Sequence, residues 1–198
     1  MLQLTRSCLS TLGLALALVT SAASAATIET RFGALDGLGI GLASGDAFEY
    51  GNLVNAQPDG TNDWVGGGFA ASLPVSWSGS LTGASLQVFS GGWGYGGNAG
   101  VYLNNQLVGE LTNGDSGSGD LSYAYLDTFD LAAFLGLIGA DNTLEIRAAD
   151  PEDGGSLGFF KLTLTTQDAG NTVPEPASVA LAGVALAGAL LTRRRRRD

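Results

Sequence analysis

The chain has 198 residues with 31 glycines, only 14% charged residues and no histidine, a composition that disfavours long helices and favours short strands joined by turns. Between residues 26 and 172, seventeen acidic side chains outnumber three basic ones (Arg31, Arg147 and Lys161) and give a net charge of −14, which excludes binding to nucleic-acid backbones. The lack of histidine, and of any cysteine besides Cys8, excludes imidazole catalysis, thiol chemistry and structural zinc beyond the N-terminal segment.

The N-terminal segment has the three parts of a secretory signal peptide. Arg6 supplies the positive charge, residues 9–19 are apolar, and Ala23-Ser24-Ala25 fits a small-residue cleavage site. We therefore expect residues 1–25 to be a signal peptide that engages the Sec translocon and is cleaved by signal peptidase after Ala25. A retained membrane anchor is the alternative, although the apolar run is short for a span.

The middle of the chain shows the alternation of apolar and polar side chains that is typical of strands. The clearest case places Phe160, Leu162 and Leu164 on one face. The predicted strands are 73–81, interrupted by Pro74 near its start, 84–88, 123–129, 144–147 and 160–165.

A hairpin and one short helix complete the expected elements. Residues 101–111 fit a hairpin, because Asn104-Asn105 tolerates the positive φ angles of a tight turn. Residues 131–138 predict a helix with Asp130 as its N-cap and Gly139 near its end. We therefore expect an all-β fold over residues 26–167, a β-sandwich or jelly roll with one short helix, followed by a linker at 168–172.

The candidate binding residues are two aromatic rings in a glycine-rich loop, residues 90–98. Trp93 and Tyr95 would suit a glycan, since exposed rings stack on sugars and a loop can present them. The alternative is that one ring folds back onto the core of the sandwich. Trp64 and Trp77 lie in or beside strand-like segments and are assigned to the core.

Metal and catalytic sites have weaker support, and no catalytic residue or cofactor is predicted. Calcium is an alternative at residues 59–63 and 150–153, where Asp and Asn gather, but turn chemistry alone explains both clusters. A glycoside hydrolase would need two carboxylates at a defined separation, which sequence spacing does not reveal. The glutamates available for such a pair are Glu49, Glu110, Glu145 and Glu152.

The C-terminal tail has three consecutive parts. Val173-Pro174-Glu175-Pro176 precedes an uncharged apolar run at 177–192, and five arginines follow, Arg193, Arg194, Arg195, Arg196 and Arg197. The prolines keep the chain extended before the run. The apolar run itself predicts a single short transmembrane helix. The arginines should stay cytoplasmic, which places the acidic domain across the membrane.

This tail, residues 173–198, resembles the PEP-CTERM sorting signal, which is also known as an ice-binding protein C-terminal motif. The resemblance implies that exosortase, a membrane transpeptidase of Gram-negative bacteria, recognises Pro174, Glu175 and Pro176 and removes the helix and the arginines. It also implies transit through the inner membrane, then the cell surface, the outer membrane or a biofilm matrix of exopolysaccharide. A plain C-terminal anchor is the alternative.

Part of the middle domain resembles galactose-binding-like jelly-roll domains, in which a hairpin x-L-N-G-x-x-V-G precedes a strand a-G-x-N-x-L-x-I. The similar segments are 101–109, 129–131 and 141–146, with Asn105 where glycine is usual and Ala140-Asp141 before the asparagine. Many such domains bind glycans, but the fold alone does not fix a function. We therefore expect a structural or adhesive surface protein that is not an enzyme, with a surface-displayed carbohydrate-binding module as the alternative.

Overall fold

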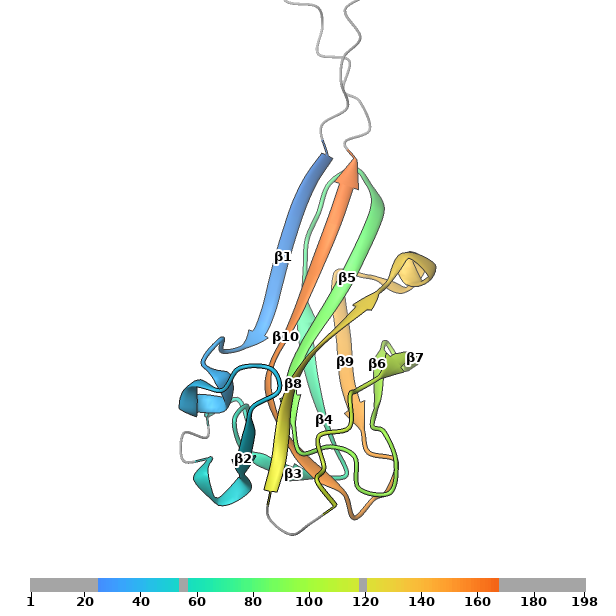
Figure 1. Ribbon diagram of the computed structural model, residues 1–198. Coiled ribbons are helices and arrows are strands. Elements are labelled where there is room, and N and C mark those ends of the chain that lie inside the picture. Colours follow the sequence, from blue (N-terminus) through green and yellow to red (C-terminus); the bar gives the residue numbers. More distant parts are fainter. Residues whose placement is uncertain (1–24, 54–56, 118–120, 168–198) are drawn as a thin grey trace, which may run out of the picture. The chain divides into compact units, whose positions relative to one another are not determined.

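The computed structural model describes residues 25–53, 57–117 and 121–167, whose strands form two antiparallel sheets (Figure 1). The first sheet has the order β1 (Ala25–Gly33), β10 (Gly154–Gln167), β5 (Ser80–Gly91), β8 (Leu121–Asp130) and β2 (Ala47–Glu49), and β3 (Trp64–Gly66) also pairs with β10. The second has the order β4 (Gly68–Pro74), β9 (Asp141–Arg147), β6 (Gly100–Leu103) and β7 (Gln106–Glu110). The all-β prediction is confirmed. The expected signal helix within residues 1–24 and the transmembrane helix at 177–192 lie outside the described residues.

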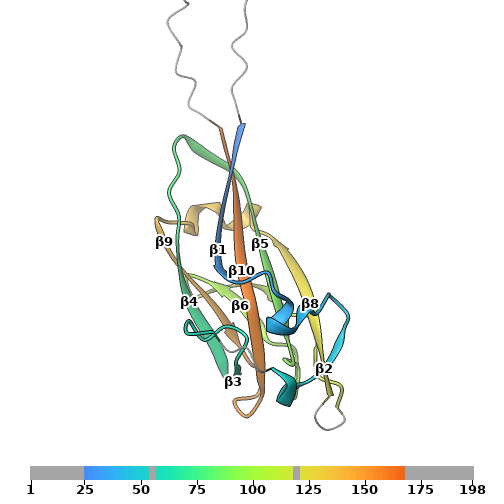
Figure 2. The ribbon, with the colours of Figure 1, turned by 90° about the vertical axis from the view of Figure 1, so that its left-hand side faces the viewer.

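The main hydrophobic core lies between the two sheets (Figure 2). Phe160, Leu162 and Leu164 of β10 are buried from the first sheet, and Leu144 and Ile146 of β9 from the second. Each such side chain contributes about 1.5–3 kcal/mol by leaving water. The strands predicted at 84–88, 123–129, 144–147 and 160–165 are confirmed as parts of β5, β8, β9 and β10.

A smaller core lies on the other face of the first sheet. Phe159 and Phe89 alternate with the buried residues of the main core, so their side chains point to the opposite face. The two rings stack with their centroids 5.9 Å apart. Leu38, Phe48 and Ala124 complete this cluster. The segment between β1 and β3, which supplies Leu38 and Phe48, therefore packs on the outside of the sandwich.

The β6–β7 hairpin turns at Asn104-Asn105, as predicted, with φ angles of 50° and 68°. The Asn104 side-chain amide nitrogen, Nδ2, donates to the Leu137 carbonyl at 2.7 Å and to Asn142 Oδ1 at 3.2 Å. Asn142 is 1% exposed; its amide accepts from Gly139 N at 2.9 Å and donates to the Gly139 carbonyl at 2.9 Å and to the Leu73 carbonyl at 3.3 Å. This buried amide joins β4, β9, the hairpin and the loop before β9.

The described helices are all short: η1 (Gly37–Gly41), η2 (Tyr50–Asn52) and η3 (Ala132–Leu137). The helix predicted at 131–138 is confirmed as η3, a 3₁₀ helix. Asp130 accepts a hydrogen bond from Ala132 N at 2.9 Å, although the residue at the cap position is Leu131. Across the described ranges, no helix has the length and hydropathy needed to cross a membrane.

The strand predicted at 73–81 is wrong. β4 ends at Pro74 and β5 begins at Ser80, so residues 75–79 connect the two sheets. Proline has no N–H to continue a ladder, the Val75 N–H donates to the Ala140 carbonyl at 2.8 Å, and Gly79 turns the chain with a φ of 77°. Trp77, within this connection, packs partly buried against the main core, as predicted.

Replacing Asn142 by alanine should lower the free energy of unfolding. The change removes the partner of the Gly139 backbone N–H and C=O, and an unsatisfied buried polar group costs about 1–3 kcal/mol. Urea unfolding should show the loss, whereas Thr143→Ala, at the exposed next position of β9, should change stability by less than about 0.5 kcal/mol. Equal effects of the two substitutions would contradict a structural role for the buried amide.

Candidate functional site

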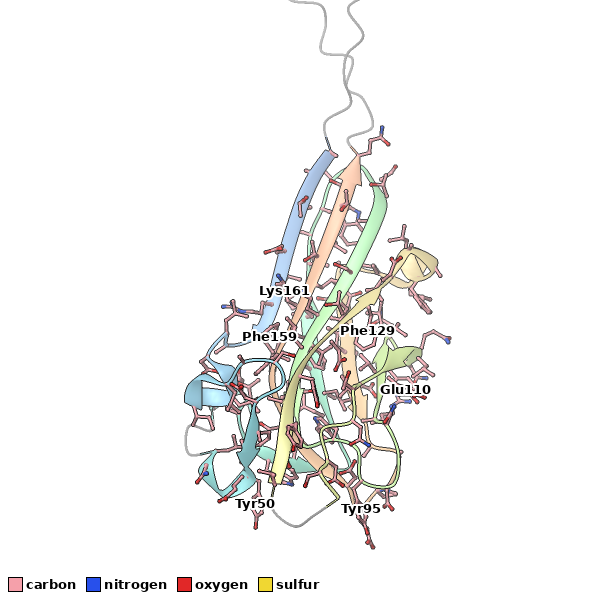
Figure 3. All side chains as sticks on the ribbon, in the orientation of Figure 1. Tyr50, Tyr95, Glu110, Phe129, Phe159 and Lys161 are labelled. Atoms are coloured by element: carbon pink, nitrogen blue, oxygen red, sulfur yellow. The ribbon has the colours of Figure 1, made fainter. Side chains whose placement is uncertain are left out.

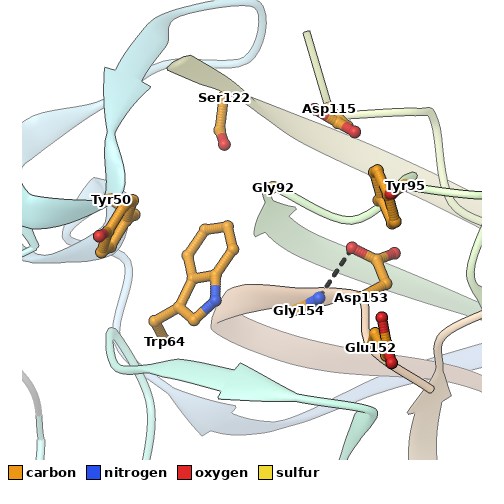
Figure 4. A pocket seen from close by; sticks show the side chains of 9 residues that line it. All are labelled: Tyr50, Trp64, Gly92, Tyr95, Asp115, Ser122, Glu152, Asp153 and Gly154. Carbon is orange, nitrogen blue, oxygen red and sulfur yellow. Dashed lines mark hydrogen bonds between the residues drawn. The ribbon is translucent and has the colours of Figure 1, made fainter. Parts of the chain in front are cut away.

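A cavity of about 340 Å³ opens at one end of the first sheet (Figure 4). It lies at the end of the domain away from the start of β1 and the end of β10, where Tyr50 and Tyr95 are seen in Figure 3. Its lining comes from strands, from a short helix and from three loops, those between β5 and β6, β7 and β8, and β9 and β10. The lining residues are Tyr50, Trp64, Gly92, Tyr95, Asp115, Ser122, Glu152, Asp153 and Gly154.

Two glycines make room for the Trp64 indole. β3 pairs with the start of β10, so that Trp64 lies opposite Ser156. A Cβ on Gly154 would lie 2.6 Å from Trp64 Nε1, and a Cβ on Gly92 would overlap the far edge of the indole. Gly92 also has a φ of 87°, which side-chain-bearing residues rarely adopt. The indole therefore packs directly on the backbone and forms a fixed part of the cavity wall.

Tyr50, at the start of η2, extends this aromatic wall. Its ring centroid lies 5.5 Å from that of Trp64 with the planes inclined by 49°, a tilted geometry that aromatic pairs favour. The Tyr50 side chain is 49% exposed. Figure 4 shows Tyr50 and Trp64 on one side of the cavity and Tyr95 on the other.

The structure separates the two rings that the sequence suggests as a glycan-binding pair. Tyr95 is 59% exposed and lines the cavity, whereas Trp93 is 1% exposed and belongs to the main core. The Trp93 ring packs against Gly155, where a Cβ would lie 2.6 Å from Cδ2. Trp93 thus has no exposed face for a sugar, in line with the alternative in which one ring folds onto the core. Sugar binding by Tyr95 remains a prediction.

Three carboxylates line the same cavity, those of Asp115, Glu152 and Asp153. Asp153 is buried and accepts hydrogen bonds from Gly94 N at 3.0 Å and Gly154 N at 2.7 Å. Burial raises the pKa of the Asp153 carboxyl above its usual value, and the backbone N–H groups partly oppose this shift. The bond to Gly94 ties the loop that carries Tyr95 to the turn before β10.

Asp59 and Asp150, from the two clusters suggested as calcium sites, use their carboxylates within their own turns. Asp59 Oδ1 accepts from Thr61 N at 3.0 Å and from Thr61 Oγ1 at 2.6 Å, and Asp150 Oδ1 accepts from Glu152 N at 2.8 Å. Within the described part of the chain, no group of three or more acidic, histidine or cysteine side chains is placed to hold a metal. The hydrogen bonds fit the turn interpretation of both clusters.

The four glutamates named for a hydrolytic pair are not all brought to one site. Glu152 lines the cavity, while Glu110 ends β7 of the second sheet and Glu145 accepts from Arg147 Nε at 2.7 Å on β9. Glu49 ends β2, next to Tyr50.

The site residues predicted at the two ends of the chain fall mostly beyond the described ranges. Ala23, Pro174, Glu175, Pro176, the linker 168–172 and the arginines 193–197 all lie there. Ala25 is described: it begins β1 and pairs with Gln167, the last residue of β10.

The aromatic wall is not evident from the sequence. The strand-like pattern around Trp64 favours the core, and Trp64 does pack half-buried against the smaller core. Its other role, as a lining residue of the cavity, is not indicated by that pattern, and nothing in the sequence singles out Tyr50. The available signal is the position of Trp64 directly after the polar turn at 59–63, since such turns lie at the ends of a sandwich. Asp153 stands out in the sequence only as a turn residue.

Comparison with known proteins identifies the tail. Residues 172–197 match the PEP-CTERM protein-sorting motif, which confirms that part of the sequence interpretation. No curated protein sequence matches the chain.

Several solved structures are similar to part of this chain. A β-porphyranase of glycoside hydrolase family 86 from the human gut bacterium Bacteroides plebeius is 18% identical, with 56% of this chain and 20% of that chain covered and a TM-score of 0.36. Two structures of BuGH86 in complex with neoagarooctaose are 14% and 12% identical, each with 75% of this chain covered, with TM-scores of 0.42 and 0.41. This chain spans about a fifth of the length of each.

Substituting Gly154 by alanine should destabilise the domain through the Trp64 wall. The new methyl group would lie 2.6 Å from Trp64 Nε1 and 2.9 Å from the Val65 carbonyl, and such overpacking costs about 1–3 kcal/mol. Gly136→Ala is the control, because nothing lies within 4 Å of its Cβ position, and it should stabilise η3 by about 0.4–1 kcal/mol. Urea denaturation of both variants measures the contrast, and a neutral Gly154→Ala would refute the close packing.

Asp153 should make stability depend on pH in the direction opposite to a salt-bridged carboxylate. A carboxyl with a raised folded pKa binds more protons when folded, so its contribution is present at low pH and is lost as pH rises through the folded pKa. The stability of the wild type relative to Asp153→Asn should therefore be greatest below pH 3.8, the ordinary pKa of this carboxyl, and should fall as the pH rises above it through the folded pKa. Denaturant unfolding across this range tests the sign, and a relative stability that rises with pH would contradict it.

Proposed function

We propose that this chain is an exported protein that exosortase processes through the PEP-CTERM protein-sorting motif at residues 172–197. Its proposed destination is the surface or the exopolysaccharide matrix of a Gram-negative bacterium. The match to the sorting motif is the observation that carries the proposal. The order of the segments supports it, since the extended Pro174-Glu175-Pro176 stretch precedes an apolar run and then the arginines.

A structural or adhesive role suits the folded domain. β10 ends at Gln167, only a few residues before the motif begins, while the cavity opens at the other end of the sheets. The cavity therefore lies at the end of the domain opposite to Gln167, the last described residue before the motif. The role proposed is a non-catalytic one.

A surface-displayed carbohydrate-binding module is the second candidate, and the cavity favours it. Sugar-binding sites combine aromatic rings for the apolar faces of the sugar with acceptors for its hydroxyl groups. Tyr50, Trp64 and Tyr95 provide the rings, and the carboxylates of Asp115, Glu152 and Asp153 provide the acceptors.

The sorting proposal predicts the covalent ends of the mature protein. Intact mass and peptide mapping of protein from its native host should give a form that begins at Ala26 and ends near Pro174 to Pro176, without Arg193–Arg197. Replacing Pro174, Glu175 and Pro176 together by alanine should leave the arginines on the protein, because the recognition residues are gone while the apolar run is intact. Retention of the arginines on most of the unaltered mature protein would instead make the tail a plain anchor.

A further inference from the structure

We propose that the cavity between Tyr50, Trp64 and Tyr95 recognises a protonated amine on a sugar, so that its ligand is a glycan with free amino sugars. This inference rests on the carbohydrate-binding candidate above and names its substrate class. It excludes as ligands the glycans that carry carboxylate, sulfate or phosphate groups.

The aromatic residues are placed to contact a cation as well as a sugar ring. Tyr50 and Trp64 form one side of the cavity, Tyr95 the other, and both tyrosines are about half exposed (Figure 4). The face of an aromatic ring carries negative electrostatic potential, so it attracts an ammonium group, and tryptophan does so most strongly. The protein makes this contact elsewhere, where the Arg147 guanidinium lies 4.0 Å above the Tyr102 ring.

The negative charge of the residues that line the cavity favours a positively charged ligand. Three carboxylates reach this cavity, and none of the described lining residues is lysine or arginine. The domain around it carries a net charge of −14 over residues 26–172, so the long-range field has the same sign. An anionic glycan would be repelled, while an ammonium group would gain charge-assisted hydrogen bonds, which are about twice as strong as neutral ones.

Asp153 is held in place for such a contact. The backbone N–H groups of Gly94 and Gly154 fix its carboxylate, the Tyr95 backbone also contributes a hydrogen bond, and a carboxylate has about four acceptor positions. Burial raises the pKa of Asp153, and the negative charge of Asp115 adds to this shift. A bound ammonium would offset this cost, because an opposite charge nearby favours the ionised carboxylate.

The cavity is also largely formed before a ligand arrives. Trp64 lies on Gly92 and Gly154 with no room to move inward, and the Asp153–Gly94 bond restrains the loop of Tyr95. Preformed walls reduce the entropy lost on binding. The volume of about 340 Å³ lies at the lower end of small-molecule sites, roughly 300–1,000 Å³, and suits a short stretch of a longer glycan.

Calorimetric titration of the mature protein with three probes tests the ligand class. The probes are a glucosamine oligosaccharide with protonated amines, its fully N-acetylated counterpart of equal length, and an oligolysine of equal charge. The glucosamine oligosaccharide should bind at least about tenfold more tightly than either of the others, and its advantage should shrink with added salt because the attraction is electrostatic.

The other possible results distinguish failure of the amine preference from failure of the carbohydrate-binding candidate. Equal binding of the two oligosaccharides would overturn the amine preference and leave a carbohydrate-binding module. Equal binding of the oligolysine would overturn sugar recognition, since only charge would matter. No binding of either oligosaccharide by folded protein would overturn both this inference and the carbohydrate-binding candidate, but not the sorting proposal.

Matched variants locate the site. Glu152→Gln and Tyr95→Ala, at exposed positions, should each weaken glucosamine-oligosaccharide binding by about tenfold, whereas Tyr95→Phe, which keeps the ring, should bind as the wild type does. Glu110→Gln is the control, because it removes the same charge from an exposed position on β7 away from the cavity (Figure 3). An equal loss in Glu110→Gln would show that net charge, rather than this cavity, attracts the ligand, and would overturn the proposal.

Discussion

The backbone ladder along β10 is the interaction on which the rest of the domain depends. On one edge β10 pairs with β5 over almost its full length. On the other edge it is shared: Gly154–Ser156 pair with β3, the Leu157 carbonyl accepts from Asn62 N at 2.8 Å, and the residues from Phe159 onward pair with β1. Since buried backbone groups need partners, this division sets where the segment between β1 and β3 must return to the sheet. The return places Trp64 beside the first residues of β10 and thereby creates the aromatic wall.

Two consecutive glycines at the start of β10 then place one tryptophan at the cavity and another in the main core. Successive residues of a strand point to opposite faces, and Gly154 and Gly155 each leave room for an indole. Trp64 occupies the space at Gly154 and Trp93 the space at Gly155, so one tryptophan lines the cavity while the other fills the main core. The contact surface of the site and the packing of the sandwich are therefore linked through two adjacent backbone positions.

Local pattern is sufficient to predict much of the fold and little of the site. Strands such as the one with Phe160, Leu162 and Leu164 alternate clearly, and Asn104-Asn105 carries its own turn preference, so both can be predicted from neighbouring residues. The strand expected at 73–81 fails because Ala140, which binds the Val75 N–H, is distant in sequence. The burial of Trp93 and the half-buried position of Trp64 at the cavity depend in the same way on Gly155 and Gly154, which are also far along the chain. The sorting motif is recognisable because its information lies in consecutive residues.

The pairing of Ala25 with Gln167 also has a consequence for the order of events during export. β1 contains the first described residues of the chain, and among the described strands its ladder partner is β10, the last of them to be synthesised. A contact between such distant positions is slow to form, and under the proposed export it cannot form until β10 has crossed the membrane. The sorting tail follows immediately in the sequence. The sandwich would thus close its first sheet only as the tail arrives, and completion of the fold and recognition of the tail would coincide in time.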